Sequence, residues 1–370
     1  MNNFLEKIAE VKSKNLYRNL VDTDFIGDVF VKRNNKKIIC FSSNDYFSLA
    51  NNLFVKLGAI YAILRYGVSS RSSRYICGNN SLYKKLEKKI SKITGFEDAI
   101  TFSSGYQAAL GIIPALVKEG DVVIADKLIH SCLIEGVKLS GAKLIRFNHN
   151  DIEHAKQIIY NNKDKKILII TEEIFSMDGD RGNIEELRSL ASKYKAMILI
   201  DAAHSLYDNI YNKISQNSNI VELKMGTFSK ALGSFGGYVA GNFDIIEYLR
   251  NFSKSAIYTT ALPPSIIASS YTSLKILEKK KLHKKVLGNA KYFCDLLNIP
   301  FNNSAIVIII IGEASRSLEI AAQIEKRGFL ISAIRPPTVE HNKSRLRITF
   351  SSSHKKSQIK KLAKNIKNFL

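Results

Sequence analysis

Short β-branched runs alternate with helix-period segments through the middle of the chain. The candidate strands cover residues 98–103, 121–125, 143–147, 166–171, 196–201, 221–226 and 236–240. Between most of them lie stretches such as YQAALGIIPALVKEG and NIEELRSLASKYKA, whose apolar residues recur at helical spacing. Parallel strands need such helical crossovers, so the alternation predicts an α/β domain with a mostly parallel, seven-stranded sheet.

The pattern changes after ALPPS at 261–265. A long helix is expected over about 265–295, because prolines can begin a helix but not continue through it. The strand SAIVIIIIGEA, the helical SLEIAAQIEKRGF and the strand SRLRITFSS follow. We therefore expect an N-terminal segment (1–40), a large domain (41–285) and a small C-terminal α+β domain (286–370).

Composition and leader patterns narrow the class of protein. The longest apolar run, AIVIIII at 305–311, is too short to span a bilayer, and the first residues carry no apolar leader. The four cysteines lie far apart without a C-x-x-C pair, and no histidines share a ligand spacing. We expect a cytoplasmic protein with no membrane partner, no disulfide framework and no metal site.

The formal net charge of +22 could indicate a nucleic-acid-binding protein. The lysines are spread along the whole chain together with many Asn and Ile, and there is no zinc-finger, helix-turn-helix or RNP-like signature. We expect no nucleic-acid partner, and a basic binding protein stays the disfavoured alternative.

Polar residues follow two of the predicted strands. Asp201 and His204 in IDAAHS follow the apolar run AMILI, and Lys230 in GTFSKALGSFGG follows the next strand. Open α/β sheets bind ligands at the carboxyl ends of their strands, and a confined lysine can act as an amine nucleophile. Each residue also has a structural interpretation, the aspartate as a helix cap and the lysine as a surface cation.

A third segment, SSGYQAAL at 103–110, opens a predicted helix whose free N–H groups could bind an anion or simply be capped. Thr227 and Ser229 add hydroxyl groups near the lysine. A phosphate cradle, a strand-end aspartate, a histidine and a confined lysine together fit one cofactor, pyridoxal 5'-phosphate.

The segments TEEIFSMDGD, IDAAHS, GTFSKALGSFGGYVAG and IYTTALPPS occur in an order and spacing that resemble the α-oxoamine synthase family of fold-type I, pyridoxal-phosphate-dependent transferases. The resemblance runs from FSSNDYFSLA at 41 to RLRITFSSSH at 345–354. It implies a homodimer with sites at the subunit interface that condenses an amino acid with an acyl thioester. Another fold-type I chemistry, such as transamination or aldol cleavage, stays an alternative.

The segment AIRPPTVEHNKSRLRITFSSSH is most similar to members that use L-alanine and a pimeloyl thioester, carried on coenzyme A or on acyl carrier protein. Members that use glycine or serine share the lysine motif and stay alternatives. The acyl chain length and its carrier are left open.

The resemblance also implies roles for single residues. Lys230 would bind the cofactor aldehyde, Asp201 would pair with the pyridine nitrogen, His204 would hydrogen-bond the phenolate oxygen, and His130 would stack on the ring. These four are the expected catalytic residues.

The same resemblance assigns further residues to the cofactor and the substrates. The phosphate would be bound by Gly105, Tyr106, Thr227 and, across the dimer interface, Thr260; Glu172 and Ser176 would line the site. Arg347 and Arg335 would bind the carboxylates of the amino acid and the product, and Asn44 and Arg18 belong to the matching N-terminal substrate-binding region.

One segment and two single residues depart from the family pattern. Residues 69–74 read SSRSSR where a glycine-rich GSGGSR is usual, Tyr83 replaces a histidine, and Ala202 replaces the acidic second residue of DDAH or DEAH. Glycine permits backbone angles that arginine resists, so the loop is expected to be reshaped. Arg71 and Arg74 are expected to add positive charge near the thioester entrance, and Ala202 is expected to leave Asp201 and His204 in their roles.

Overall fold

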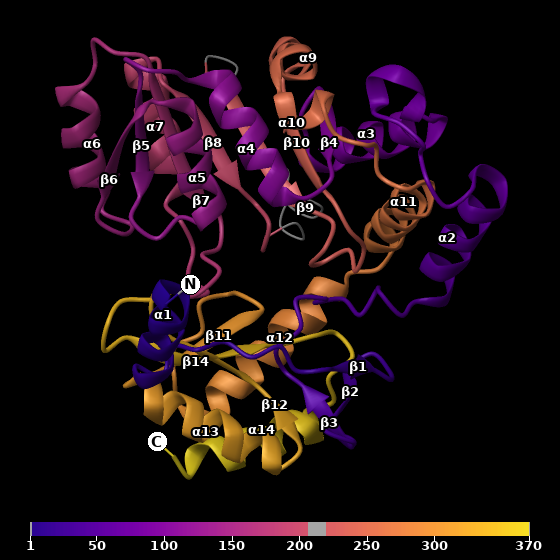
Figure 1. Ribbon diagram of the computed structural model, residues 1–370, viewed down its shortest axis with the longest axis vertical. Helices are drawn as coiled ribbons and strands as arrows, with labels where there is room; N and C mark the ends of the chain where they lie inside the picture. Colours follow the sequence, from indigo (N-terminus) through magenta and orange to yellow (C-terminus); the bar gives the residue numbers. More distant parts are fainter. Residues whose placement is uncertain (1, 206–219, 370) are drawn as a thin grey trace. The chain divides into compact units, whose positions relative to one another are not determined.

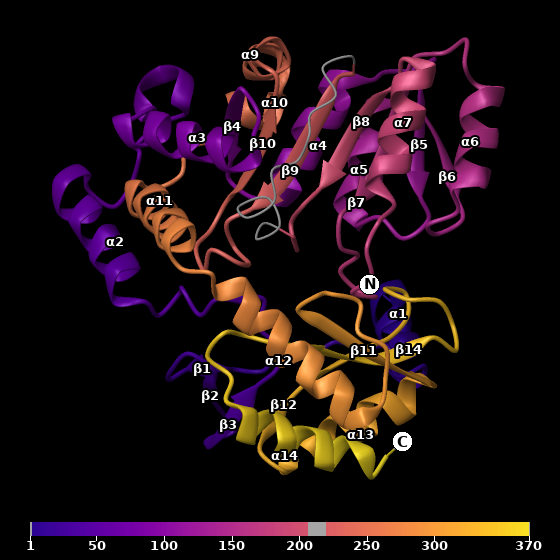
Figure 2. The ribbon, with the colours of Figure 1, turned by 180° about the vertical axis from the view of Figure 1, so that it is seen from behind.

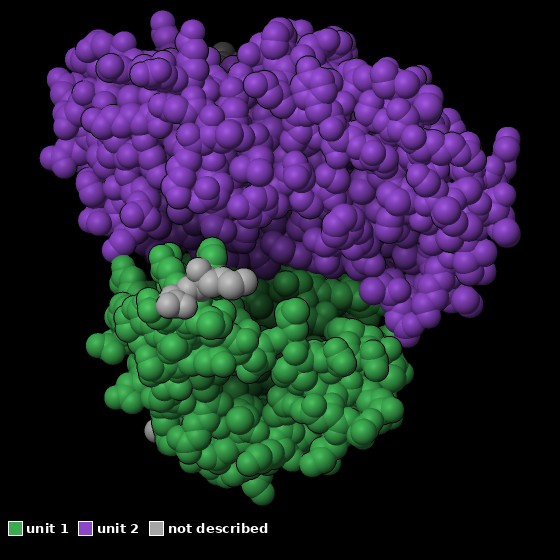
Figure 3. All heavy atoms as spheres, in the orientation of Figure 1, with its two compact units in different colours: residues 1–48, 177–180, 282–370 green, residues 49–176, 181–281 purple. Residues whose placement is uncertain are grey.

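The computed structural model describes residues 2–205 and 220–369 (Figure 1, Figure 2). Its contacts divide the chain into two compact units, coloured separately in Figure 3. Unit 1 comprises Met1–Ser48, Met177–Asp180 and Leu282–Leu370, and unit 2 comprises Leu49–Ser176 and Arg181–Lys281. The domain boundaries that the sequence predicts, after residues 40 and 285, stay a prediction.

Unit 2 contains the mostly parallel sheet that the alternation predicts. Within its described residues the strands are β4 (Asp98–Phe102), β5 (Val122–Asp126), β6 (Lys143–Phe147), β7 (Ile167–Glu172), β8 (Met197–Asp201), β9 (Glu222–Thr227) and β10 (Gly237–Gly241). They lie in the order β4-β10-β9-β8-β7-β5-β6. Among these strands β10 alone runs in the opposite direction to the others. The prediction of a mostly parallel, seven-stranded sheet is therefore confirmed.

Helices cover both faces of this sheet. One face packs against α4 (Gly105–Leu116), α5 (Ser131–Ser140), α9 (Phe243–Phe252) and α10 (Lys254–Ile257), and the other against α6 (Ile152–Asn161) and α7 (Ile184–Tyr194). Figure 1 shows α4 and α5 in front of the sheet. Figure 2 shows the molecule from the opposite side, where α7 lies in front of the sheet.

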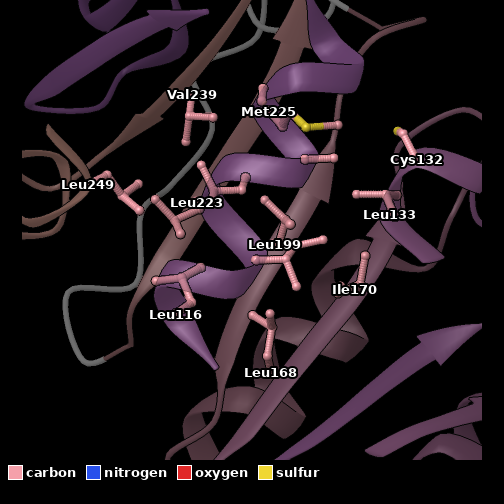
Figure 4. Packing of buried hydrophobic residues seen from close by; sticks show 14 of the residues in the cluster. Leu116, Cys132, Leu133, Leu168, Ile170, Leu199, Leu223, Met225, Val239 and Leu249 are labelled. Atoms are coloured by element: carbon pink, nitrogen blue, oxygen red, sulfur yellow. The ribbon is translucent and has the colours of Figure 1, made fainter. Parts of the chain in front are cut away.

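Alternation within each strand produces these two cores. Leu168 and Ile170 of β7 enter the α4–α5 core, drawn in Figure 4, whereas Ile167 and Ile169 enter the α6–α7 core. Successive side chains of a strand point to opposite faces, so a strand buried on both sides has to be apolar throughout.

The remaining regular structure in the described residues of unit 2 is helical. It comprises α2 (Leu53–Tyr66), the short π-helix η1 (Arg74–Gly78), α3 (Ser81–Thr94) and α11 (Pro264–Lys279). Helices α2 and α11 pack together. A side chain at Gly58 would come within 2.7 Å of Thr272 Oγ1, so the glycine leaves room for the Thr272 hydroxyl where the two helices meet.

Unit 1 joins the N-terminal residues to the C-terminal part of the chain. Its sheets are β1 (Asp24–Phe25), β2 (Phe30–Arg33), β3 (Lys36–Cys40) and β12 (Phe329–Leu330), and then β11 (Ile306–Gly312), β14 (Ser344–Thr349) and β13 (Ser332–Ile334). The helices are α1 (Asn2–Ser13), α12 (Leu282–Leu297), α13 (Ala314–Lys326) and α14 (Lys356–Lys367). Phe41, Phe293 and Phe350 form the centre of its core.

The single helix expected over about 265–295 is wrong, because two helices, α11 and α12, occupy this range. Lys280, between them, has extended backbone angles (φ −117°, ψ 119°). The break coincides with the change from unit 2 to unit 1 at residue 282, and helical periodicity carries no signal of that change. In the described part of the chain, no helix has the length and apolar character that a membrane crossing requires.

Candidate active site

A cavity of about 200 Å³ lies in unit 2 where β7, β8 and β9 end and α4 begins. The residues predicted from the sequence that line it are Gly105, Tyr106, His130, Glu172, Ser176, Asp201, His204, Thr227 and Lys230. The carboxyl ends of parallel strands meet at one edge of the sheet, and this brings together motifs far apart in the chain.

Lys230 and Asp201 face this cavity with His204. The Nζ atom of Lys230 lies 2.9 Å from Nε2 of His204, and Oδ1 of Asp201 accepts a hydrogen bond from the backbone N–H of Ala203 at 2.8 Å. Burial raises the pKa of Asp201, and the charge of Lys230 together with the Ala203 N–H opposes the rise. A buried carboxylate of this kind favours a cationic partner in the cavity.

His130 and Glu172 form the wall beside them. His130 is the N-cap of α5, its backbone N–H donates to Oε1 of Glu172 at 2.6 Å, and its Nδ1 accepts from the N–H of Cys132. Burial lowers the pKa of His130, so the imidazole is held neutral. Burial also raises the pKa of Glu172 well above its usual value, with the nearby Asp201 as the second cause.

The opposite end of the cavity presents hydrogen-bond donors. Ser104 caps α4 by accepting from Gln107 N–H at 3.1 Å, and Gly105 opens the helix. A side chain at Gly105 would project toward Thr227, 3.6 Å from its Cβ, so its absence keeps the space between them free. The hydroxyl of Thr227 lies 2.7 Å from that of Ser229.

These groups fit pyridoxal 5'-phosphate. A helix N-terminus with two hydroxyls suits a phosphate, a buried carboxylate suits a protonated pyridine nitrogen, and an amine beside an imidazole suits an aldehyde and a phenolate. No group of three or more His, Cys, Asp or Glu side chains in the described residues is arranged to hold a metal ion.

Thr260, expected to act across a dimer interface, does not line this cavity. It is exposed and forms an isolated antiparallel bridge with Ser73. Its role in a second subunit stays a prediction.

The four residues predicted to bind substrates lie in unit 1. Nη2 of Arg347 donates to Oδ1 of Asn44 at 3.2 Å, and the hydroxyl of Tyr46 donates to the same oxygen at 3.3 Å. Burial raises the pKa of Tyr46 to about 12, although Arg347 opposes the rise. Arg347 and Asn44 are therefore neighbours, as their shared predicted role requires.

Arg335 and Arg18 form a second group in unit 1. Arg335 donates to the carbonyl oxygens of Asn15 and Tyr17 at 2.9 and 2.6 Å, and Nη2 of Arg18 donates to Thr338 Oγ1 at 3.2 Å. Arg18 borders a cavity of about 680 Å³ whose other lining residues are Val11, Leu16, Pro336, Pro337, Val339, Glu340 and His341.

The departures from the family pattern have a structural account. Arg71, where the family has glycine, adopts a left-handed φ of 65°. Arg74 makes two hydrogen bonds to Glu87 at 2.6 and 3.0 Å and stacks over the ring of Tyr83 at 4.0 Å. The expectation that Arg74 adds positive charge at an entrance is therefore wrong, since Glu87 compensates its charge, whereas Arg71 is exposed.

Five residues that line the cavity had no role predicted from the sequence: Ser104, Cys132, Ala203, Met225 and Gly226. Sγ of Cys132 lies 3.0 Å from Nδ1 of His130. The only signal was its place two residues after the histidine at the start of a predicted helix, where an N-cap side chain meets the backbone of the first turn. Met225 belongs to a buried strand and carried no signal.

Comparison with known proteins agrees with this fold. The family model for aminotransferase class I and II matches residues 36–366. The 8-amino-7-oxononanoate synthase of Methylobacterium nodulans is 38% identical over 360 residues, which cover 96% of this chain and 93% of that protein.

Solved structures include an 8-amino-7-oxononanoate synthase from Francisella tularensis, with a TM-score of 0.76 and 28% identity over 90% of this chain and 97% of that one. A serine palmitoyltransferase from Sphingomonas wittichii has a TM-score of 0.91 and 24% identity over 100% of this chain and 96% of that one. At that identity, the second likeness concerns the fold alone.

Proposed function

The chain belongs to the aminotransferase class I and II family. Within this family, we propose that it condenses L-alanine with a pimeloyl thioester. The products are 8-amino-7-oxononanoate, CO2 and a free thiol, as in biotin biosynthesis. The relatives named 8-amino-7-oxononanoate synthase support this assignment over almost the whole chain.

One observation carries the proposal. Lys230, His204, Asp201, Glu172 and His130 line a single cavity at the ends of three parallel strands, beside the N-terminus of α4. This set of an amine, two imidazoles and two buried carboxylates matches the needs of amino-acid chemistry on a phosphorylated pyridine cofactor.

The cofactor is pyridoxal 5'-phosphate. When bound, it supplies a ring that accepts the electron pair left at the amino-acid Cα. The backbone N–H groups of Gly105 and Tyr106 and the hydroxyl of Thr227 would hold its phosphate, with Thr260 of the partner subunit. Asp201 would hold the proton of the ring nitrogen, and Lys230 would bind the aldehyde.

The remaining steps belong to the side chains of this chain. After alanine replaces it, the Lys230 amine would take the proton from the alanine Cα and later return a proton to the product. His204, 2.9 Å from that amine, would orient it. His130 would cover the reacting face as a neutral imidazole, and Ser176 and Glu172 would complete the wall.

The carboxylates of alanine and of the acyl chain would be bound by Arg347, Arg335, Arg18 and Asn44. A planar guanidinium can hold a carboxylate through two parallel hydrogen bonds, which a lysine cannot reproduce. The proposed enzyme is a homodimer.

Purified enzyme with alanine, glycine or serine, each combined with pimeloyl-coenzyme A or pimeloyl-acyl carrier protein, tests the proposal. Thiol release, CO2 and product mass are measured together. We expect alanine and a pimeloyl donor to give the highest kcat/KM, with thiol and CO2 in equal amounts. Preference for glycine or serine would move the assignment to a related synthase, and formation of a keto acid without thiol would reject it.

A further inference from the structure

A buried ion pair lies on the other face of the sheet from the cavity. Nζ of Lys224, in β9, is 2.6 Å from Oε1 of Glu173, which directly follows β7. Lys224 is 0% exposed and Glu173 is 8% exposed. The two residues are 51 positions apart in the chain and belong to strands that do not touch, since β8 lies between them.

The strand register shows what the pair crosses. Glu172 pairs with Asp201 on β8, so Glu173 lies opposite Ala202, and Lys224 pairs with Ile200. Side chains alternate along a strand, so Glu173, Ala202 and Lys224 share one face while Glu172 and Asp201 share the other. The ion pair therefore reaches across β8 beside the small side chain of Ala202.

This geometry explains the unusual Ala202. In the DDAH and DEAH patterns an acidic side chain occupies this position, between the two flanking strands. Here the acid stands one strand away, at Glu173, and the buried methyl group of Ala202 leaves room for the salt bridge. Lys224 therefore has its acidic partner at Glu173 and not at position 202.

The pair is bonded to residues that adjoin the cavity. The N–H of Glu173 donates to the carbonyl oxygen of Asp201 at 2.9 Å, and the N–H of Ala202 donates to that of Met225 at 2.7 Å. The hydroxyl of Ser205, next to His204, donates to Oε2 of Glu173. One carboxylate therefore connects β7, β9 and the turn that carries His204.

We propose that Glu173 and Lys224 are positioning residues, which hold the ends of β7, β8 and β9 so that Asp201, His204 and Lys230 keep their reactive geometry. The role rests on the proposed function in so far as these three residues act on an amino acid. A buried ion pair contributes little to stability compared with apolar residues of similar size, so a geometric role accounts for its presence better than a stabilising one.

The chain contains a matched control. Arg188 on α7 donates to Glu222 at 2.9 Å through Nε, and both side chains are buried. Glu222 lies on the same strand and the same face as Lys224, at the opposite end of β9 from the cavity. Removing this second pair tests the loss of a buried salt bridge without moving the strand ends.

The decisive variants are the double substitution Glu173→Gln with Lys224→Met and the control Arg188→Met with Glu222→Gln. The holoenzymes are compared by the rate at which they exchange the Cα proton of alanine in D2O, measured by NMR. This exchange needs no acyl donor, so it stays informative if the pimeloyl assignment fails. The dissociation constant of pyridoxal phosphate and the urea unfolding midpoint are measured in parallel.

We expect the exchange rate of the Glu173–Lys224 double variant to fall roughly 10- to 100-fold, because misplacement of reacting groups by about 1 Å can cost that much. The KM for alanine and the unfolding midpoint should stay near the wild-type values, and the control variant should keep its exchange rate. A folded double variant with the wild-type exchange rate would overturn the proposal, as would an equal loss in the control.

A residue exchange keeps the proposal testable if the double variant does not fold. Glu173→Ala with Ala202→Glu moves the acid to the position usual in the family, beside Lys224, so that the buried lysine keeps a carboxylate. An exchange rate near that of the wild type in this variant supports positioning by the pair. A folded exchange variant whose rate falls about 100-fold or more would overturn it.

Discussion

Lys230 opposes the effect of burial on the Asp201 carboxyl in the cavity. Burial alone would favour the neutral form of the Asp201 carboxyl, and the lysine charge lowers its pKa against that trend. The same cavity keeps His130 neutral by burial. At the scale of single residues, Lys230 therefore favours the charged form of Asp201, whereas burial favours the neutral form of His130.

Lys230→Ala should abolish turnover while the fold survives. The amine is expected both to bind the cofactor and to move the Cα proton, and loss of a general base alone costs about 10²- to 10⁴-fold in kcat. Borohydride reduction of the wild-type holoenzyme, followed by peptide mass spectrometry, should find the pyridoxyl group on Lys230. Lys118→Ala, an exposed lysine of the same unit, serves as the control. A label on a different lysine would contradict the assignment.

Asp201→Asn keeps the shape of the side chain and removes its charge. We expect kcat to fall by at least about 100-fold, because the substitution removes a charge aimed at the reacting ring, while the KM for alanine changes much less. Thiol release at varied alanine concentration measures both constants. A variant with near-normal kcat would show that Asp201 only caps the turn through Ala203.

At the scale of elements, Tyr83 connects α3 to the segment before α11. Its hydroxyl oxygen accepts a hydrogen bond from the buried N–H of Leu262 at 2.7 Å, and its ring lies under Arg74. Tyr83→Phe keeps the ring contact and leaves the Leu262 N–H without its acceptor. We expect a loss of about 1 to 3 kcal/mol in the free energy of unfolding, measured with urea. The exposed Tyr258→Phe should change nothing, and equal stability of both variants would contradict the prediction.

His354 connects β3 to the turn after β14 in unit 1. Its Nε2 donates to the carbonyl oxygen of Cys40 at 2.9 Å, its Nδ1 accepts from Ser351 N–H at 2.9 Å, and its ring stacks on Phe41. Both nitrogens are satisfied in the neutral form only. Burial accordingly lowers the pKa of His354 from 6.5 to about 4.

This lowered pKa makes stability depend on pH. Between about pH 4 and 6.5 the unfolded chain binds the proton that folded His354 excludes, so stability is full above pH 6.5 and is lost as the pH falls. The slope approaches about 1.4 kcal/mol per pH unit in this range. Urea unfolding at several pH values should show a flatter slope for His354→Phe than for wild type. Parallel slopes would contradict the assignment.

At the scale of the whole molecule, we expect the net charge of +22 to attract anionic substrates. Coenzyme A and acyl carrier protein are both polyanions, and a basic protein attracts them over a screening length of about 8 Å at physiological salt. We expect kcat/KM for the acyl donor to fall steeply as salt rises, while the KM for zwitterionic alanine stays nearly constant.

Arg71→Ala tests the contribution of the SSRSSR loop. Arg71 is exposed, whereas Glu87 compensates the charge of Arg74, so we expect the single substitution to flatten the salt dependence as much as the Arg71→Ala and Arg74→Ala pair does. Equal salt slopes in wild type and Arg71→Ala would assign the effect to charge elsewhere on the surface.

Local sequence patterns are enough to predict the sheet and the main groups of the site. Strands buried on both faces, such as β7 and β8, are short continuous apolar runs, which can be recognised in the sequence without knowledge of the fold. Asp201, His204 and Lys230 directly follow such runs, and their place at the sheet edge follows from parallel topology. The family resemblance added the roles of His130 and the phosphate residues, which periodicity does not reveal.

The contacts between distant side chains depend on the folded arrangement of the chain and could not be predicted from local patterns. Glu173 and Lys224 pair across β8, Glu87 compensates Arg74, Cys132 lies against His130, and the helix expected over 265–295 breaks at Lys280. Helix and strand patterns depend on residues a few positions apart, whereas these contacts depend on strand register and on packing between segments far apart in the chain. The buried ion pair beside Ala202 exists because three strands align in one register, and no local pattern encodes that alignment.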